Sequence, residues 1–361
     1  MSIPLDRLYN FLHDLCNHDD ILIYRFFPHG SKKLDDLKLV NQIRKIQLIP
    51  IYVLCHDQEP LHWNLYSSTP TCTINLRAIL SYRGAMYDEV LLVHSEKQSP
   101  ELDHYELNGF IGVYYWSHAI IARDWFRYAK IDPILSQKKQ PAQDFLVYNR
   151  AWSGTREYRL KFTELVVDYD LVKSCNMKFN PVEETEHYQN HKFVNSVFRP
   201  VRYDLEQYFS LSAVGPTASA DYNNADYAGT AIEVVLETLF DDQRWQLTEK
   251  ALRPIACGHP FMLAASQGSL EYLRSYGFKT FAGLINEDYD TIVDHRQRLE
   301  AIVSEMKRIA SLSPTEKQKL YSQLEVIAAH NRKHFFSDKF MDQVITEYKT
   351  NLELGLNRIT A

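Results

Sequence analysis

Thr248, Glu249 and Lys250 form a triplet with clear chemical potential, placed where a helix is expected to begin. Threonine favours the N-cap position, and the apolar pattern that follows predicts a helix over residues 247–258. A helix start offers backbone N–H groups and the positive end of the helix dipole, which both favour phosphate. Lys250 adds a positive charge, and Glu249 can accept hydrogen bonds from ribose hydroxyls. The triplet therefore suits a nucleotide diphosphate, although a first helical turn also carries such charges without any ligand.

Residues around the triplet could complete such a site. Glu237 ends the strand expected over residues 231–238, and Gly258 is a candidate helix C-cap before Pro260 and Phe261. Arg150 and Arg156, followed by Arg159, open the same half of the chain. An arginine can pair with a diphosphate through two hydrogen bonds and stabilise it as a leaving group. Arg156 and Arg159 are equally compatible with surface charges on a helix.

The densest set of candidate general bases is His56-Asp57-Gln58-Glu59-Pro60, at the end of an apolar run. Transfer to a hydroxyl group needs a base near the acceptor. We expect Asp57 to be that base, with Glu59 as the second candidate and His56 orienting or sharing the proton. Glu96 and His118 are weaker alternatives, and the whole segment could also be a polar turn.

Asp288 and Asp290 have the D-x-D spacing that sometimes marks a metal site. The pair precedes a predicted helix, where aspartate commonly caps the N-terminus. We therefore assign these residues to capping and predict no metal.

The elements that must position these residues alternate between strands and helices. Apolar runs predict strands at 21–27, 48–60, 89–97, from 110, 145–150, 231–238 and 260–265, and helices from about 122, over 155–169, 247–258 and 268–278, and after 287. Near-continuous apolar strands are typical of parallel sheets that are covered on both faces. Ligands bind at the carboxyl ends of such strands. His56, Asp57, Glu59, Ser95 and Glu96 should lie at that edge.

We predict an α/β protein with two Rossmann-like domains that face a cleft, followed by C-terminal helices. The expected boundaries are 1–140 for an acceptor-binding domain, 141–290 for a donor-binding domain and 291–361 for a helical segment. A proline-containing polar stretch at 131–144 reads as the linker. The 361 residues of the whole chain are enough for two domains of ordinary size.

Composition narrows the class of protein. The net charge of −6 provides no overall basic field for nucleic acid. The five cysteines are scattered without C-x-x-C spacing, so neither a disulfide framework nor a zinc site is expected. The N-terminal residues do not read as a signal peptide, and no apolar run is long enough to span a bilayer. We expect a cytoplasmic protein, and the sequence contains no signal for an oligomeric state.

The order of a strand ending in glutamate, a loop, Thr-Glu-Lys, an apolar helix and Gly-x-Pro-Phe resembles the donor-binding half of GT-B-fold glycosyltransferases. Residues 237–278 are similar in particular to the fucosyltransferase and exostosin-like group. The resemblance implies that Glu249 holds the donor ribose, that Lys250 and the arginines bind the phosphates, and that Glu237 lies near the donor. It implies a nucleotide sugar, UDP-linked in our expectation, as co-substrate, with no other cofactor.

The segments 247–261 and 268–281 also resemble glycosyltransferases of tailed bacteriophages. That resemblance implies glucosyl or arabinosyl transfer to 5-hydroxymethylcytosine in phage DNA, in the host cytoplasm. Double-stranded DNA is then the partner, and a base must be extruded from the duplex. Aromatic and arginine residues could contact it, although core packing explains them equally well: Trp63, Tyr66, Tyr82, Arg83, Trp116, Arg123, Trp125 and Arg127. The alternatives are a fucosyltransferase-like enzyme of surface glycan synthesis and a non-catalytic nucleotide-binding protein.

Overall fold

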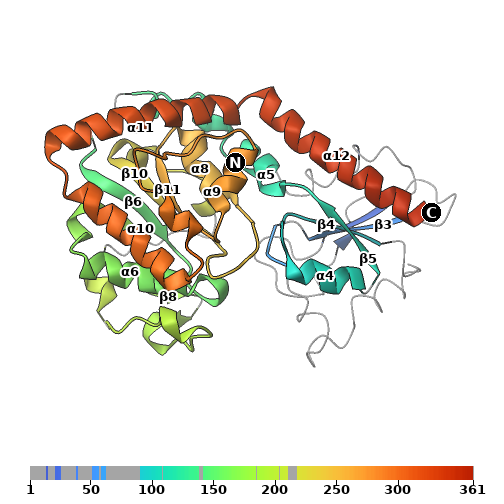
Figure 1. The fold of residues 1–361 in the computed structure, drawn as a ribbon, viewed down its shortest axis with the longest axis horizontal. Helices are drawn as coiled ribbons and strands as arrows, with labels where there is room; N and C mark the ends of the chain where they lie inside the picture. Colours follow the sequence, from blue (N-terminus) through green and yellow to red (C-terminus); the bar gives the residue numbers. More distant parts are fainter. Residues whose placement is uncertain are drawn as a thin grey trace. The chain divides into compact units, whose positions relative to one another are not determined.

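The chain divides into two compact α/β units (Figure 1). The computed structural model describes residues 14, 21–25, 38–39, 51–56, 58–61, 90–107, 109–137, 141–183, 185–202, 204–209 and 218–360. Unit 1 comprises Met1–Asp124 and Met341–Ala361, and unit 2 comprises Trp125–Phe340. The chain therefore leaves unit 1 ahead of the boundary expected at residue 140, and its last helix belongs with its first half.

Unit 1 is built on a five-stranded sheet with the order β2-β1-β3-β4-β5. Four strands run parallel, and only β2 is antiparallel to its neighbour β1. The strands are β1 (Ile21–Arg25), β2 (Lys38–Leu39), β3 (Ile51–His56), β4 (Val90–His94) and β5 (Phe110–Tyr114). All five residues of β4 are buried, as expected for a central strand covered on both faces. The four parallel strands start or lie within the segments predicted from apolar runs.

Helices α4 (Pro100–Leu107), α5 (Ser117–Trp125) and α12 (Asp338–Thr360) complete the described part of unit 1. Helix α5 begins earlier than the predicted residue 122. Helix α12 packs closely on β4 and β5, because a Cβ atom on Gly355 would lie 3.0 Å from Val113 Cγ2 and 3.1 Å from Leu91 Cδ2. Asn351 donates a hydrogen bond to the carbonyl of Tyr114 at 2.8 Å. These contacts explain why the C-terminal helix belongs to unit 1.

Unit 2 contains a fully parallel sheet with the order β11-β10-β6-β7. The strands are β6 (Gln143–Asn149), β7 (Cys175–Phe179), β10 (Thr230–Leu236) and β11 (Phe261–Ala264). The chain moves from β6 to β7 on one side and later returns to β10 on the other side. The strand order therefore reverses between β6 and β10, which is where ligands bind in open α/β sheets. Strand β7, with its alternating buried and half-buried residues, was not predicted.

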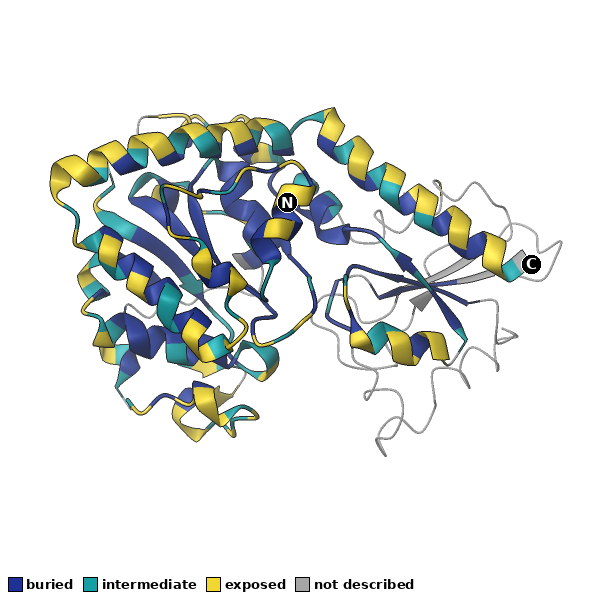
Figure 2. Ribbon diagram, viewed as in Figure 1, coloured by how far each residue is buried: buried dark blue, intermediate teal, exposed yellow. Residues whose placement is uncertain are grey.

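Two helical layers cover the sheet of unit 2 (Figures 1 and 2). Helices α8 (Glu249–Cys257) and α11 (Pro314–Phe335) pack together on one face, whereas α6 (Tyr158–Asp168) and α10 (His295–Ala310) pack together on the other. All seven residues of β10 are buried between them. One of these residues is Glu233, whose charge is balanced by Arg253 of α8 at 2.6 Å and by the hydroxyl of Tyr227 at 2.6 Å.

The connection from β7 to β10 is a long excursion with little regular structure. It holds the two-stranded hairpin β8 (Val182–Glu183) and β9 (Glu186–His187) and the short helix α7 (Asn224–Ala228). Between them lie the 3-10 turns η5 (Tyr188–Asn190), η6 (Ser196–Phe198), η7 (Leu205–Gln207) and η8 (Ala218–Ala220). Carboxylate side chains of α6 and of its N-cap residue hold the excursion in place by accepting hydrogen bonds from its backbone. Glu157 accepts from the N–H groups of residues 194 and 195, and Glu164 accepts from those of residues 201 and 202.

Local capping signals fix the helices around the sheet. Thr248 caps α8, and Gly258 ends it in a left-handed conformation with φ of 64°, so both predictions for this helix are confirmed. Ser313 and Glu316 form a capping box at the start of α11. The region predicted to be helical after residue 287 consists of η9 (Asp288–Thr291), α10, α11 and α12, separated by short breaks.

The prediction that the D-x-D pair caps the following helix is wrong: Asp290 caps a preceding helix, and among the described residues Asp288 contributes only backbone hydrogen bonds. Both carboxylate oxygens of Asp290 accept from Leu270 N–H, at 3.2 and 3.1 Å, in the first turn of α9 (Ser269–Ser275). Gly268 precedes that helix and has no side chain to cap it. The following helix, α10, is capped by Asp294 instead. Among the described residues, no group of three or more His, Cys, Asp or Glu side chains is arranged to hold a metal ion.

The burial of Asp290 predicts a pH-dependent stability. Desolvation raises the pKa of this carboxyl group from 3.8 to about 6, against the opposing effect of the Leu270 N–H. The folded protein therefore keeps a proton that the unfolded chain has lost. Between about pH 4 and 6 the free energy of unfolding should fall as pH rises, by about 2–3 kcal/mol in total. Asp290→Asn keeps an acceptor for Leu270 and should remove this decline.

Urea unfolding of both proteins from pH 4 to 7 tests the prediction. The informative quantity is the difference between the two curves, because other groups titrate equally in both. Parallel curves would show that the buried Asp290 carboxyl does not cause the decline.

Candidate functional site

The carboxylate of Glu237 links the end of β10 to the start of α8. Its Oε1 accepts from the N–H groups of Thr248 at 3.0 Å and Ala251 at 3.2 Å. Its Oε2 accepts from the hydroxyl of Thr248 at 2.7 Å and from Thr238 N–H at 3.2 Å. Glu237 is completely buried. The glutamate predicted to lie beside the donor is thus also the acceptor that closes the N-terminus of α8.

Lys250 and Glu249 extend this hydrogen-bonded chain. The ammonium group of Lys250 lies 2.9 Å from Glu249 Oε1 and 3.2 Å from Thr248 Oγ1. Glu249 is 2% exposed, whereas the Lys250 side chain is 21% exposed. Four of the six predicted donor-site residues, Glu237, Thr248, Glu249 and Lys250, are therefore connected by direct contacts at the carboxyl edge of the sheet.

The amides at the start of α8 are already bonded. Glu237 accepts from Thr248 and Ala251, and the Lys250 N–H donates to Thr248 Oγ1 at 3.3 Å. Three of the N–H groups at this helix start, those of Thr248, Lys250 and Ala251, thus have acceptors within the protein. The positive charge of Lys250 is the part of this helix start that can still reach an anionic ligand.

Arg159 lies between the carboxyl ends of β6 and β10. Its Nη1 donates to the carbonyl of Ala151 at 2.7 Å, and its Nη2 donates to the carbonyls of Leu236 at 2.8 Å and Glu237 at 2.9 Å. The Tyr158 hydroxyl donates to the backbone carbonyl of Glu237 at 2.7 Å and to that of Ala264 in β11 at 3.2 Å. The first turn of α6 thus satisfies the carbonyl groups where the strand order reverses. Burial lowers the pKa of Arg159, and the positive charge of Arg156 acts in the same direction.

Arg150 and Arg156 lie in the loop that joins β6 to α6. Arg150 directly follows β6, and Arg156 ends the 3-10 turn η3 (Gly154–Arg156). Both are half-buried. Because β6 and β10 are paired in parallel, this loop and the Thr248–Lys250 helix start share the carboxyl edge of one sheet. All six predicted donor-site residues therefore lie at that edge.

The same loop carries a contact that sequence reasoning did not find. The N–H groups of Trp152 and Ser153 both donate to Glu183 Oε2, at 2.7 and 2.6 Å. Glu183 belongs to β8. No spacing or motif links a glutamate in an irregular excursion to a loop thirty residues earlier, so only the folded chain reveals the pair.

Histidines dominate the corresponding edge of unit 1. His56 ends β3 and is paired in register with His94 at the end of β4, which is paired with Tyr114 at the end of β5. Both histidines are buried. Burial lowers the pKa of His94 to about 4, while the Glu96 N–H donates to its Nδ1 at 3.4 Å. His94 is thus neutral near pH 7. The sequence analysis placed His56, Ser95 and Glu96 at this edge and did not single out His94.

The other predicted residues of unit 1 surround this row. His118 Nε2 donates to the carbonyl of Gln58 at 3.0 Å, which joins α5 to the segment after β3. Glu96 accepts from Leu61 N–H at 2.7 Å and from Ser99 Oγ at 2.5 Å. Glu59 is half-buried in the segment after β3. Asp57, the first candidate base, lies outside the described residues.

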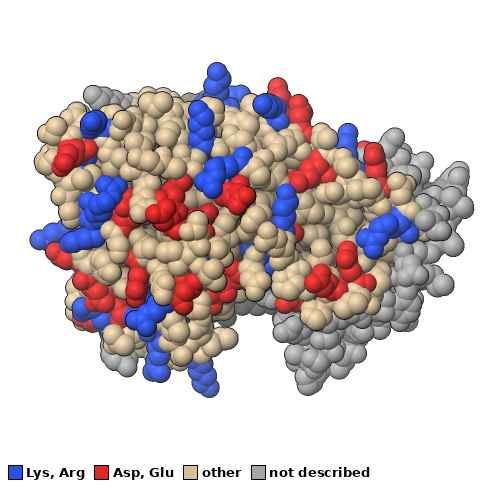
Figure 3. Space-filling view, in the orientation of Figure 1, with Lys and Arg blue, Asp and Glu red and all other residues tan. Residues whose placement is uncertain are grey.

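The residues considered for DNA contact have mixed positions. Trp116 is completely buried, so it belongs to the core. Arg123, Trp125 and Arg127 are half-buried, and Arg127 stacks over the exposed ring of Tyr128 at 4.5 Å. The remaining candidates lie outside the described residues: Trp63, Tyr66, Tyr82 and Arg83. On the face shown in Figure 3, acidic and basic side chains are interspersed, which gives no broad basic area there.

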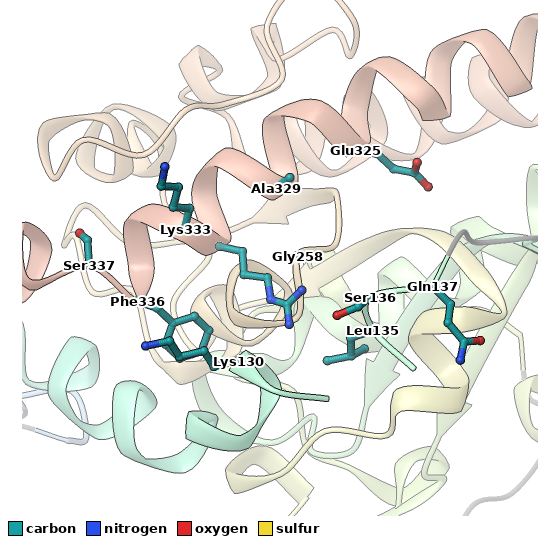
Figure 4. Close-up of a pocket in the computed structure, with 11 residues that line it drawn as sticks. Lys130, Leu135, Ser136, Gln137, Gly258, Glu325, Ala329, Lys333, Phe336 and Ser337 are labelled. Carbon is teal, nitrogen blue, oxygen red and sulfur yellow. The ribbon is translucent and has the colours of Figure 1, made fainter. Parts of the chain in front are cut away.

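A separate cavity of about 690 Å³ lies beside α11 in unit 2 (Figure 4). Its lining includes the cations Lys130, Arg332 and Lys333 and the apolar side chains of Leu135 and Phe336. The Arg332 guanidinium donates to the carbonyl of Ala129. None of the predicted catalytic or donor-binding residues that the structure describes lines this cavity.

No protein-family model matches the chain, and no curated protein or solved structure matches it significantly. None of the helices in the described part of the chain is long and apolar enough to cross a membrane. The function must therefore be argued from the chemistry of the site and from the motif in residues 237–278.

The role of Glu237 in closing α8 predicts a stability effect. Glu237→Gln replaces a carboxylate that accepts from four donors. The NH₂ group of the glutamine cannot accept a hydrogen bond, so at least one of these donors loses its acceptor. We expect the free energy of unfolding to fall by about 1–3 kcal/mol. Chemical denaturation of both proteins at pH 7 measures this loss.

Glu271→Gln is the matched control, because it removes an exposed carboxylate from the first turn of α9. Its effect should stay within about 0.5 kcal/mol. Equal effects of the two substitutions would show that Glu237 contributes only its charge near a helix N-terminus.

Proposed function

We propose that the protein is a glycosyltransferase of GT-B type that takes a sugar from a nucleotide-sugar donor. The observation that carries the proposal is the connected set Glu237, Thr248, Glu249 and Lys250 at the carboxyl edge of a parallel sheet. This edge lies beside the reversal of strand order, where α/β sheets bind ligands. The motif of residues 237–278 and the two α/β units are the further support.

The chemistry of the set matches the parts of a nucleotide sugar. The carboxylate of Glu249 can accept from the ribose hydroxyls, and Lys250 can supply a positive charge for the diphosphate. These two side chains form an ion pair with each other. Binding of a UDP-linked donor would replace that pair with one contact to the ribose and one to a phosphate. Arg150 and Arg156 would stabilise the departing diphosphate from the loop after β6.

The acceptor would be activated by residues of unit 1. Asp57 remains our first candidate for the general base, followed by Glu59, with His56 orienting the proton. His94 is neutral and can donate from Nε2 while its Nδ1 accepts from Glu96, so it suits a neutral hydrogen-bond donor to the acceptor. We propose 5-hydroxymethylcytosine in phage DNA as the acceptor, because of the resemblance of residues 247–261 and 268–281 to phage enzymes.

The first test is mass spectrometry of nucleosides after incubation with hydroxymethylcytosine DNA and a panel of nucleotide sugars. A pentose or hexose added to hydroxymethylcytosine supports the whole proposal and identifies the donor. Donor hydrolysis without DNA modification would overturn the DNA acceptor and favour a glycan acceptor. Binding of nucleotides with neither transfer nor hydrolysis would overturn the transferase assignment.

A second prediction concerns the ribose contact. Glu249→Gln should weaken UDP binding by about 1–3 kcal/mol, since a buried carboxylate acceptor is replaced by a neutral amide. Isothermal titration calorimetry with UDP measures the change. Glu271→Gln, on the neighbouring helix, should leave the affinity unchanged. Wild-type affinity in Glu249→Gln would remove this residue from the site.

A further inference from the structure

Two sets of backbone N–H groups at the carboxyl edge of unit 2 are each occupied by a carboxylate of the chain itself. Glu237 occupies the start of α8, and Glu183 Oε2 occupies the N–H groups of Trp152 and Ser153. Two N–H groups that converge on a single anionic oxygen form an anion-binding geometry. The sheet edge predicted to bind a diphosphate thus holds two internal anions.

The two carboxylates differ in how easily they can leave. Glu237 is completely buried and serves four donors. Glu183 is half-buried and lies on a hairpin whose strands contain only two residues each, next to Val182, which is 41% exposed. Two-stranded hairpins are marginally stable by themselves. Glu183 is therefore the carboxylate that a ligand can displace.

Glu183 also differs from the other carboxylates that bind paired amides. Glu157 and Glu164 lie at the start of α6 and within it, and both reach outward to hold the excursion. Glu183 points the opposite way, from the excursion to the loop after β6. That loop is at the reversal of strand order, whereas the amides bound by Glu164 belong to the excursion.

The surroundings of the loop favour an anion more negative than a carboxylate. Arg159 contacts the loop at Ala151, and its guanidinium donates to the carbonyl oxygens of Ala151, Leu236 and Glu237. Its Nε is buried and has no hydrogen-bond acceptor among the described residues. The charge of Arg156 acts on the same guanidinium. Apart from Gly154 itself and its two chain neighbours, no heavy atom of the described residues lies within 4 Å of the position that a Cβ atom on Gly154 would take, which leaves room beside the loop.

We propose that the Glu183 carboxylate occupies the position of a phosphate oxygen. A diphosphate that binds there displaces this carboxylate and releases the hairpin β8–β9 from the loop after β6. This inference rests on the proposed function and adds a regulatory step to the same site. The diphosphate accepts from Trp152 and Ser153 in place of Glu183, so the number of N–H contacts is conserved. The displaced carboxylate moves away from the arriving negative charge.

Glu183→Gln tests the competition. The amide oxygen can still accept from both N–H groups but carries no charge, so it is a weaker competitor. Affinities for inorganic pyrophosphate and UDP, measured by calorimetry, should increase about fivefold or more. Glu164→Gln, which alters the matched pair of amide contacts in the excursion, should give no increase. Unchanged or weaker binding by Glu183→Gln would overturn the proposal.

A second variant, and hydrogen exchange of the wild-type protein, keep the proposal testable if Glu183→Gln does not fold. Ser153→Pro removes one N–H group at a residue whose φ of −78° suits proline, and should weaken pyrophosphate binding. Hydrogen exchange over residues 182–187 of the wild-type protein should become faster when pyrophosphate binds. Slower or unchanged exchange would indicate a purely structural contact.

The outcomes also separate this inference from the proposed function. Tighter pyrophosphate binding by Glu183→Gln, without sugar transfer by the wild type, would support the anion site and overturn the transferase. Sugar transfer by the wild type, with no gain in binding by Glu183→Gln, would leave the transferase standing and overturn the displacement.

Discussion

A buried carboxylate joins one of the two central strands of unit 2, β10, to the helix that carries the candidate site. Glu237 needs hydrogen-bond donors because a carboxylate without hydrogen bonds is costly to bury. It finds them in the amides of Thr248 and Ala251 and in the Thr248 hydroxyl. These bonds fix where α8 begins, and therefore where Glu249 and Lys250 stand relative to the sheet. Any account of ligand binding at this edge depends on that constraint.

The same physical solution recurs at several other places in unit 2, in irregular segments and at the start of α9. Irregular segments expose backbone N–H groups that need acceptors once they are buried. Side chains of Glu157, Glu164, Glu183 and Asp290 supply these acceptors across long separations in sequence. Several acidic residues of this unit therefore serve as backbone acceptors. The number of acidic residues in the sequence is a poor guide to how many are available to a ligand.

Local signals in the sequence were sufficient for much of the fold. Apolar runs located most parallel strands of the two sheets but not β7, and Thr248 with Gly258 gave the limits of α8 because capping depends on neighbouring residues. Contacts between distant segments were beyond such signals. Neither the pairing of Glu183 with the loop after β6 nor the packing of α12 on unit 1 has a local signature. The sequence predicted which residues make up the candidate site. The hydrogen bonds among these residues became evident only in the folded chain.

The path of the chain through the two units has a consequence for its synthesis. Unit 2 is continuous from Trp125 to Phe340, whereas unit 1 is assembled from both ends of the chain. As the ribosome releases the chain, unit 2 has all its residues before unit 1 does. The face of β4 and β5 against which Gly355 lies stays uncovered until α12 emerges. This face of the first unit is thus exposed while unit 2 is being synthesised, when it is most open to chaperones and to aggregation.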